Sequence, residues 1–153
     1  MTLRWLLAAL HLLALGIGLG AIWVRARSLR SPVGERALQR VFLADTTWGL
    51  AAVLWIGTGL WRLLGGLEKP TGYYLHNSMF MAKMGCLVVI LLLEIRPMVI
   101  LMGWRRQVAA ARAPDTQAAG GLAGTSFAQA ILVVIMVFAA TAMARGIGGG
   151  SAP

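Results

Sequence analysis

The chain is poor in charged residues, and above all in acidic ones. Of its 153 residues, 5 are Asp or Glu and 14 are Lys or Arg, so that charged residues make up 12% of the total. A soluble domain carries about 25% charged residues and is roughly 45–50% apolar, whereas 59% of this chain is apolar. So little charge excludes a disordered chain and most water-soluble enzymes. We therefore expect an integral membrane protein.

Cysteine is almost absent as well. The single cysteine, Cys86, lies in an apolar run, so that an intramolecular disulfide and a CxxC redox or zinc motif are both excluded. We expect Cys86 to act as a small buried hydrophobe. The sequence also contains no P-loop, nucleophile elbow or HExxH motif. No residue is therefore assigned a catalytic role, and whether the protein is an enzyme is left open.

Long apolar runs are what the chain has in abundance. A transmembrane helix needs about 20 apolar residues, and four stretches reach that length, at about 3–24, 45–64, 75–102 and 127–144. They are continuous rather than alternating, which favours helices over barrel strands. The first is longer than a signal peptide and lacks a cleavage site, so we expect it to be retained. The sequence predicts an all-α transmembrane four-helix bundle over residues 1–145 and a disordered tail at 146–153.

Two segments are predicted to interrupt this pattern. The third run is longer than the bilayer core is thick, so we expect Pro97 to kink the helix and send Met98–Trp104 along the membrane interface, the alternative being a membrane core placed later, near Ala82–Met102. The stretch Ala109–Ser126 is rich in Ala and Gly and contains Pro114. That composition is typical of a flexible loop.

The positive charges lie mainly between the runs. The first connection carries Arg25, Arg27, Arg30, Arg36 and Arg40, and the third carries Arg105, Arg106 and Arg112. The positive-inside rule places both connections in the cytoplasm and both termini outside, in the periplasm, for a multi-pass protein of the bacterial inner membrane. The net charge of +9 is then topological, and no nucleic-acid partner is expected, because no aromatic platform accompanies the arginines. The expected partners are the lipid bilayer and a membrane-protein subunit or a second copy of the chain.

Ionisable residues inside the runs are the candidates for function, because a charge at the bilayer centre costs at least ~2.5–3.5 kcal/mol. We expect His11 either to hydrogen-bond to a neighbouring helix or to ligate a metal or haem iron. Lys83 shares one helix face with Leu87, Ile90 and Glu94. It is predicted to meet His11 across the bundle, the alternative being a side chain that extends to the outer headgroups.

The remaining charges in the runs have simpler alternatives. Asp45 is expected to cap the second helix or to pair with a loop arginine. Arg62 is expected to anchor the interface or to hold an anionic group such as a carboxylate. Glu94 is expected to pair with Arg96 or Arg105.

Small and sulfur-containing residues give two further predictions. Gly16 and Gly20 form a small-xxx-small pair that should let the first helix approach a neighbour closely. A group of thioethers lies near Lys83 and consists of Met79, Met81 and Met84, with His76 close by in sequence. Thioethers suit Cu(I), and ordinary apolar filling is the alternative.

Several of these residues form a pattern that resembles a bacterial family of predicted membrane proteins with unknown function. The pattern comprises His11, Asp45-x-x-Trp48-Gly49, Gly59-x-x-Arg62, Tyr73-Tyr74 and Phe80-x-x-Lys83, and the resemblance covers about residues 1–145.

That family is in turn distantly similar to the HemJ-type protoporphyrinogen oxidases and the CopD-like copper-resistance proteins, which are helical bundles. HemJ-type proteins carry a histidine in helix one and a lysine in helix three and are associated with b-type haem. His11 and Lys83 match these two positions. About eleven residues after the lysine, where a HemJ-type histidine is expected, the chain has Glu94. The motif around Asp45 also differs from the HemJ-type pattern.

Two functional hypotheses follow. In the first, the protein binds haem b or another tetrapyrrole, with His11 as the iron ligand and Lys83 or Arg62 near a propionate. In the second, it is a non-enzymatic accessory, assembly or transport subunit of a membrane complex, copper handling included. Convergence of His11 and Lys83 on a cavity large enough for a macrocycle would favour the first hypothesis. A tight hydrogen-bonded core would favour the second.

Overall fold

The computed structural model describes residues 2–30, 33–65 and 77–148. These form four helices, α1 (Thr2–Arg30), α2 (Glu35–Leu64), α4 (Ser78–Ala109) and α5 (Ala119–Ala144). Each is long and apolar enough to cross a membrane. The predicted all-helical fold with four spans is confirmed, while the side of the membrane on which the termini lie stays a prediction.

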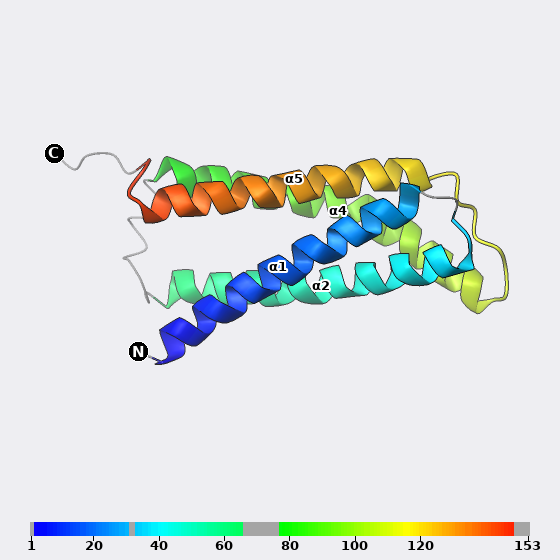
Figure 1. Cartoon of the computed structure of the whole chain (residues 1–153), viewed down its shortest axis with the longest axis horizontal. Helices are drawn as coiled ribbons and strands as arrows, with labels where there is room; N and C mark the ends of the chain where they lie inside the picture. The colour runs from blue at the N-terminus through cyan, green and yellow to red at the C-terminus, as the bar shows by residue number, and fades with distance from the viewer. Residues whose placement is uncertain (1, 31–32, 66–76, 149–153) are drawn as a thin grey trace.

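The helices are arranged as two pairs (Figure 1). α1 packs along α2, α4 packs along α5, and α1 also crosses α5. α1 begins and α5 ends at the same end of the bundle, which we call the terminal end. At the opposite end α1 finishes and α2 starts among the arginines, and we call it the arginine-rich end. Since α1 runs diagonally from α2 toward α5, the two pairs diverge at the terminal end and converge at the arginine-rich end.

Two apolar clusters hold the bundle together. The first occupies its middle and includes Ile22, Trp48, Trp55, Ile90 and Met136, with the half-buried Cys86 packed against it. The second cluster fills the arginine-rich end and includes Leu29, Leu38, Val41, Leu101, Trp104 and Leu122. Within a bilayer, close packing of these side chains favours association of the helices.

This second cluster explains why the helices run past the apolar stretches of the sequence. α1 continues to Arg30 and α2 begins at Glu35, because Leu29 and Leu38 are buried there and the Arg, Ala and Leu residues at these two helix ends are good helix formers. The stretch Met98–Trp104 belongs to α4 and packs within the bundle, while its course along the membrane interface stays a prediction. α4 is helical through Pro97, and both Leu101 and Trp104 are buried.

The loop expected over Ala109–Ser126 is also wrong in its second half. α5 begins at Ala119, and Leu122, Ala123 and Ser126 are buried against the rest of the bundle. Alanine is the strongest helix former, and packing of this face outweighs the glycines beside it.

The ends of α4 and α5 meet at the terminal end. The side chain of Asn77 caps α4 by accepting hydrogen bonds from the backbone N–H groups of Met79 and Phe80. The carbonyl of Gly148 accepts a hydrogen bond from the backbone N–H of Ser78 at 3.0 Å. Residues 146–148 of the predicted tail therefore form a turn against α4, and residues 149–153 lie outside the described residues.

Close approach of α1 and α2 depends on one glycine. A Cβ atom added at Gly16 or Gly20 would meet nothing within 4 Å, so the close approach predicted for that pair is wrong. A Cβ added at Gly18 would instead lie 3.1 Å from Cζ3 of Trp48 and 3.4 Å from Cβ of Ala51. Gly18 therefore sets the distance between the two helices.

This difference predicts opposite effects for two glycine substitutions on α1. We expect Gly18→Ala to lower the free energy of unfolding by about 1–3 kcal/mol, because the added methyl group must push the buried Trp48 ring out of its packed position. Gly16→Ala adds helix propensity without a clash and should leave stability unchanged or raise it by up to ~1 kcal/mol. Thermal unfolding in detergent micelles, followed by circular dichroism, measures both. Equal midpoints for the two variants would contradict the assignment.

Candidate functional site

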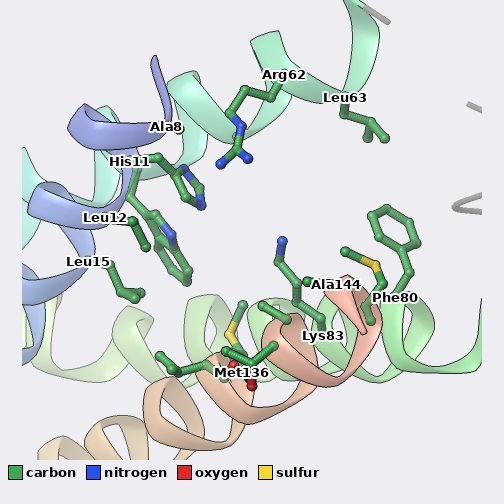
Figure 2. A pocket seen from close by; sticks show the side chains of 16 residues that line it. Ala8, His11, Leu12, Leu15, Arg62, Leu63, Phe80, Lys83, Met136 and Ala144 are labelled. Carbon is green, nitrogen blue, oxygen red and sulfur yellow. Dashed lines mark hydrogen bonds between the residues drawn. The ribbon is translucent and has the colours of Figure 1, made fainter. Parts of the chain in front are cut away.

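A cavity of about 500 Å³ lies at the terminal end, between the two helix pairs (Figure 2). Its walls are mainly apolar and include Trp55 and Phe80. Three basic side chains reach it from three different helices: His11 from α1, Arg62 from α2 and Lys83 from α4. No acidic residue occurs among the described residues that line it. The cavity therefore combines apolar walls with a cationic polar lining.

His11 is held in one orientation by α2. Its Nδ1 lies 3.0 Å from Oγ1 of Thr58. The same hydroxyl lies 2.7 Å from the carbonyl oxygen of Leu54, to which it donates its only proton. With the proton placed there, Thr58 accepts from Nδ1–H of His11, and Nε2 is then the basic nitrogen. The hydrogen bond thus fixes the orientation of the ring.

Two neighbours on α2 shape the space around this ring. The ring centroids of His11 and Trp55 are 6.0 Å apart, with planes tilted by 39°. A Cβ atom added at Gly59 would lie 3.0 Å from Cε1 of His11. The missing side chain at Gly59 therefore leaves the room that the imidazole occupies, which gives the Gly59-x-x-Arg62 pattern a physical reason.

The structure brings together the residues that the sequence singled out. His11 hydrogen-bonds to a neighbouring helix and also lines a cavity. The expected hydrogen bond and the expected role as a ligand are therefore compatible. Lys83 lines the same cavity, and on its helix face Ile90 is buried. Arg62 lies there too, although the interfacial anchor was the simpler expectation. What these three residues bind stays a prediction.

The copper hypothesis gains little from the positions of its residues. Met81 is exposed, and neither Met79 nor Met84 lines the cavity. His76 and the pair Tyr73-Tyr74 lie outside the described residues. Within the described ranges, no group of three or more His, Cys, Asp or Glu is placed to hold a metal ion.

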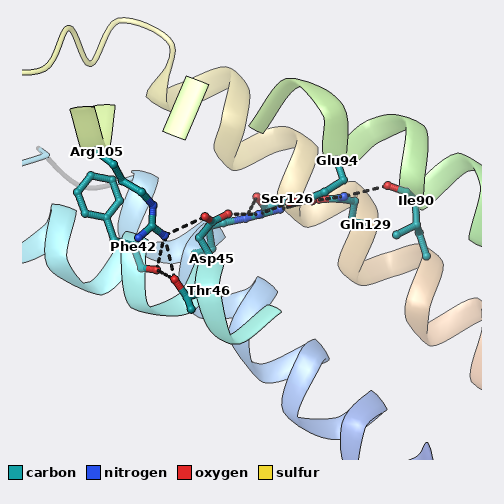
Figure 3. A network of polar contacts seen from close by, with 9 residues as sticks. Phe42, Asp45, Thr46, Ile90, Glu94, Arg105, Ser126 and Gln129 are labelled. Carbon is teal, nitrogen blue, oxygen red and sulfur yellow. Dashed lines mark hydrogen bonds and ion pairs between the residues drawn. The ribbon is translucent and has the colours of Figure 1, made fainter. Parts of the chain in front are cut away.

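A second polar group, the Arg25 cluster, is buried near the arginine-rich end (Figure 3). It consists of Arg25, Asp45, Glu94, Ser126 and Gln129 and draws on all four helices. Arg25 has no exposed surface. Its Nε donates to Ser126 at 3.0 Å, and its Nη1 donates to Asp45 at 2.9 Å and to Glu94 at 2.7 Å. Its Nη2 donates to Glu94 at 2.8 Å and to Gln129 at 2.9 Å. All five N–H groups of the guanidinium are therefore satisfied.

The two carboxylates of the cluster have further donors. Oδ2 of Asp45 accepts from Nη2 of Arg105 at 3.0 Å, and the Arg105 guanidinium lies 4.7 Å from the ring centroid of Phe42. Oε2 of Glu94 accepts from Nε2 of Gln129 at 2.7 Å. Two arginines thus balance two carboxylates, which is the condition under which burial of such groups is tolerated.

Three expectations about these residues change. Asp45 does not cap α2, which begins at Glu35, but its pairing with an arginine is confirmed. The partner expected for Glu94 was wrong, since it pairs with Arg25 and not with Arg96 or Arg105. Arg25 was counted among the loop arginines and is instead buried.

The sequence carries a signal for this cluster in the positions of its charged residues. Asp45 and Glu94 both lie in or beside apolar runs and need a buried cation. Arg25 directly follows the first run, with no helix breaker before Pro32. Ser126 and Gln129 are three positions apart on one face of the last helix.

Four apolar helices with ionisable groups turned inward define a multi-pass membrane protein. The chain matches the family of predicted membrane proteins described as DUF2214 over residues 3–148, and it belongs to that family. No curated protein and no solved structure matches the chain significantly. The resemblance to a family of unknown function is confirmed. The more distant likeness to HemJ-type and CopD-like proteins receives no support from these comparisons, and the inner membrane as the location stays a prediction.

Proposed function

We propose that this protein binds an amphipathic anion in the cavity at the terminal end, and that a tetrapyrrole such as haem b is the ligand its side chains fit best. The observation that carries the proposal is the meeting of His11, Arg62 and Lys83 in one apolar cavity. Its volume of about 500 Å³ lies within the ~300–1,000 Å³ common for small-molecule sites.

The donor set suits haem in two ways. A metal-ligating histidine usually has its second ring nitrogen held by a hydrogen bond, and Thr58 holds Nδ1 of His11 in that manner. Arg62 and Lys83 supply two cations for the two propionates, while Trp55 and Phe80 supply flat apolar walls. Bound haem would supply one-electron chemistry. The residues of the chain would hold it, orient it and exclude water.

Titration with two porphyrins tests the proposal, and it separates binding of the amphipathic anion from ligation of iron by His11. The protein in mild detergent is titrated with haem b and with protoporphyrin IX, which has the same carboxylates but no iron. We expect both to bind, with haem binding more tightly and showing the Soret band of an iron with a nitrogen ligand. Equal affinities would contradict ligation by His11, and binding of neither would overturn the proposal.

Removing the cations should weaken binding of the carboxylates. We expect Arg62→Gln and Lys83→Gln each to raise the Kd for haem by about ten- to hundredfold, since hydrogen bonds to charged groups contribute ~1.5–3 kcal/mol. The control Arg145→Gln removes an exposed charge near the same end, outside the cavity, and should change little. Haem dimethyl ester provides a second control, because esterified propionates carry no charge for these residues to recognise. A loss of affinity that is equal for haem and its ester would contradict the assignment.

A further inference from the structure

The cavity reaches the protein surface at one flank. Among the described residues that line it, the exposed ones are Leu12 on α1 and Thr141 and Ala144 on α5. The lining residues that α2 and α4 contribute are buried or half-buried. The opening therefore lies between the first half of α1 and the last turns of α5, where these helices diverge (Figure 1).

This flank is apolar, as a surface in contact with lipid must be. Leu12 is 64% exposed, and on the same two helices Leu13 is 61% and Phe138 is 70% exposed. The hydroxyl of Thr141 donates to backbone carbonyls of its own helix, at 3.0 Å to Val137 and 2.9 Å to Phe138. The polar side chain among the three exposed lining residues therefore has partners within its own helix and does not face the hydrocarbon unpaired.

The charged side chains of the lining lie on the helices away from the opening. The two cations of the lining, Arg62 and Lys83, come from α2 and α4, the helices that do not form the opening. Figure 2 shows both side chains directed into the cavity. A molecule that enters between α1 and α5 would therefore meet apolar side chains first and the cations at the far wall.

We infer that the cavity opens sideways into the bilayer, between α1 and α5, and takes its ligand from the lipid phase as an amphipathic anion whose charged end faces Arg62 and Lys83. This inference rests on the proposed ligand site and adds the route and the orientation of the ligand. A ligand of this class partitions into the membrane, and its apolar part stays in contact with Leu12 when bound.

Spin labels test whether the opening faces lipid. Leu12→Cys and Leu13→Cys are labelled separately in a Cys86→Ala background, and each protein is reconstituted in phosphatidylcholine vesicles. Both labels should be more accessible to oxygen, which is lipid-soluble, than to a water-soluble nickel chelate. Saturating protoporphyrin IX should lower the oxygen accessibility at position 12 and leave position 13 unchanged. Preferential access of nickel at position 12 would overturn the sideways opening.

Transfer kinetics test the route itself. Haem b is supplied in donor vesicles, and the Soret band of the reconstituted protein is followed in time. Leu12→Trp should slow the uptake by about tenfold or more, which corresponds to ~1.4 kcal/mol in barrier height, while the equally exposed Leu13→Trp should not. Equal rates for the two variants would overturn the route. A label at position 12 that faces lipid in a protein that binds neither porphyrin would overturn the proposed function and support the opening alone.

Discussion

Replacing Arg25 by methionine is expected to lower the free energy of unfolding by about 3–5 kcal/mol, enough to prevent folding of a marginally stable bundle. The substitution removes five hydrogen bonds at once and leaves the carboxylate of Glu94 in the bundle without its cation. Arg25→Lys should recover only part of the loss, because an ammonium has three donors and cannot reproduce the planar fork. Unfolding in mixed detergent micelles, followed by circular dichroism, measures the change.

Two matched variants decide whether burial and pairing are the cause. Arg27→Met removes an exposed arginine from the same helix and should change stability little. The double substitution Arg25→Met with Glu94→Met removes the ion pair as a whole, and Asp45 keeps Arg105 as its partner. It should regain much of the lost stability, since replacing a complete buried pair by apolar residues is often neutral. If Arg25→Met were as stable as Arg27→Met, the structural role of the cluster would be refuted.

The second large effect is expected at the proposed haem ligand. His11→Ala should remove the Soret band of nitrogen-ligated iron and raise the Kd for haem by more than ~100-fold, because loss of a hydrogen-bond partner behind a ligand already costs about 10–100-fold. Thr58→Val, which keeps the ligand and removes its hydrogen bond, should produce that smaller effect. Absorption titrations in detergent measure both.

Iron-free porphyrin provides the control for these two variants. Protoporphyrin IX offers the same carboxylates and the same apolar surface without a metal, so its affinity should be nearly unchanged in His11→Ala and Thr58→Val. Free imidazole added to His11→Ala should restore the band by occupying the vacated position. A haem spectrum of His11→Ala identical to that of the unmodified protein would show that His11 does not ligate iron.

The four helices could be predicted because their cause is local. Length and hydropathy alone decide whether a run can cross a bilayer, and the described part of each run lies within a helix of the structure, apart from the cap residue Asn77. The end of the predicted loop at residue 126 could not be predicted in this way. Ala and Gly around residue 120 are typical of a loop, and only packing of Leu122 and Ala123 against the other helices makes the segment helical.

The candidate site was partly predictable for the same reason. Counting residues from the outer helix ends placed His11 and Lys83 at similar depth, and the structure has both on one cavity. The Arg25 cluster depends instead on how each helix is rotated about its axis. Its partners come from positions 45, 94, 126 and 129, and a single sequence does not encode which of those faces meet. A count of positive charges treats Arg25 like Arg27, although one is buried and the other exposed.

The burial of Arg25 also bears on the order in which the protein is made. Synthesis delivers α1 to the membrane first and α5 last, yet Ser126 and Gln129 on α5 complete the acceptors of the Arg25 guanidinium. Until α5 has been synthesised, this arginine lies at its end of α1, which is predicted to be near the cytoplasmic headgroups. Its two acceptors on α5 are not yet in the membrane at that stage. Without α5, the guanidinium keeps the carboxylates of Asp45 and Glu94 but has no acceptor for two of its five N–H groups, so the last helix completes its hydrogen bonding and not its charge balance.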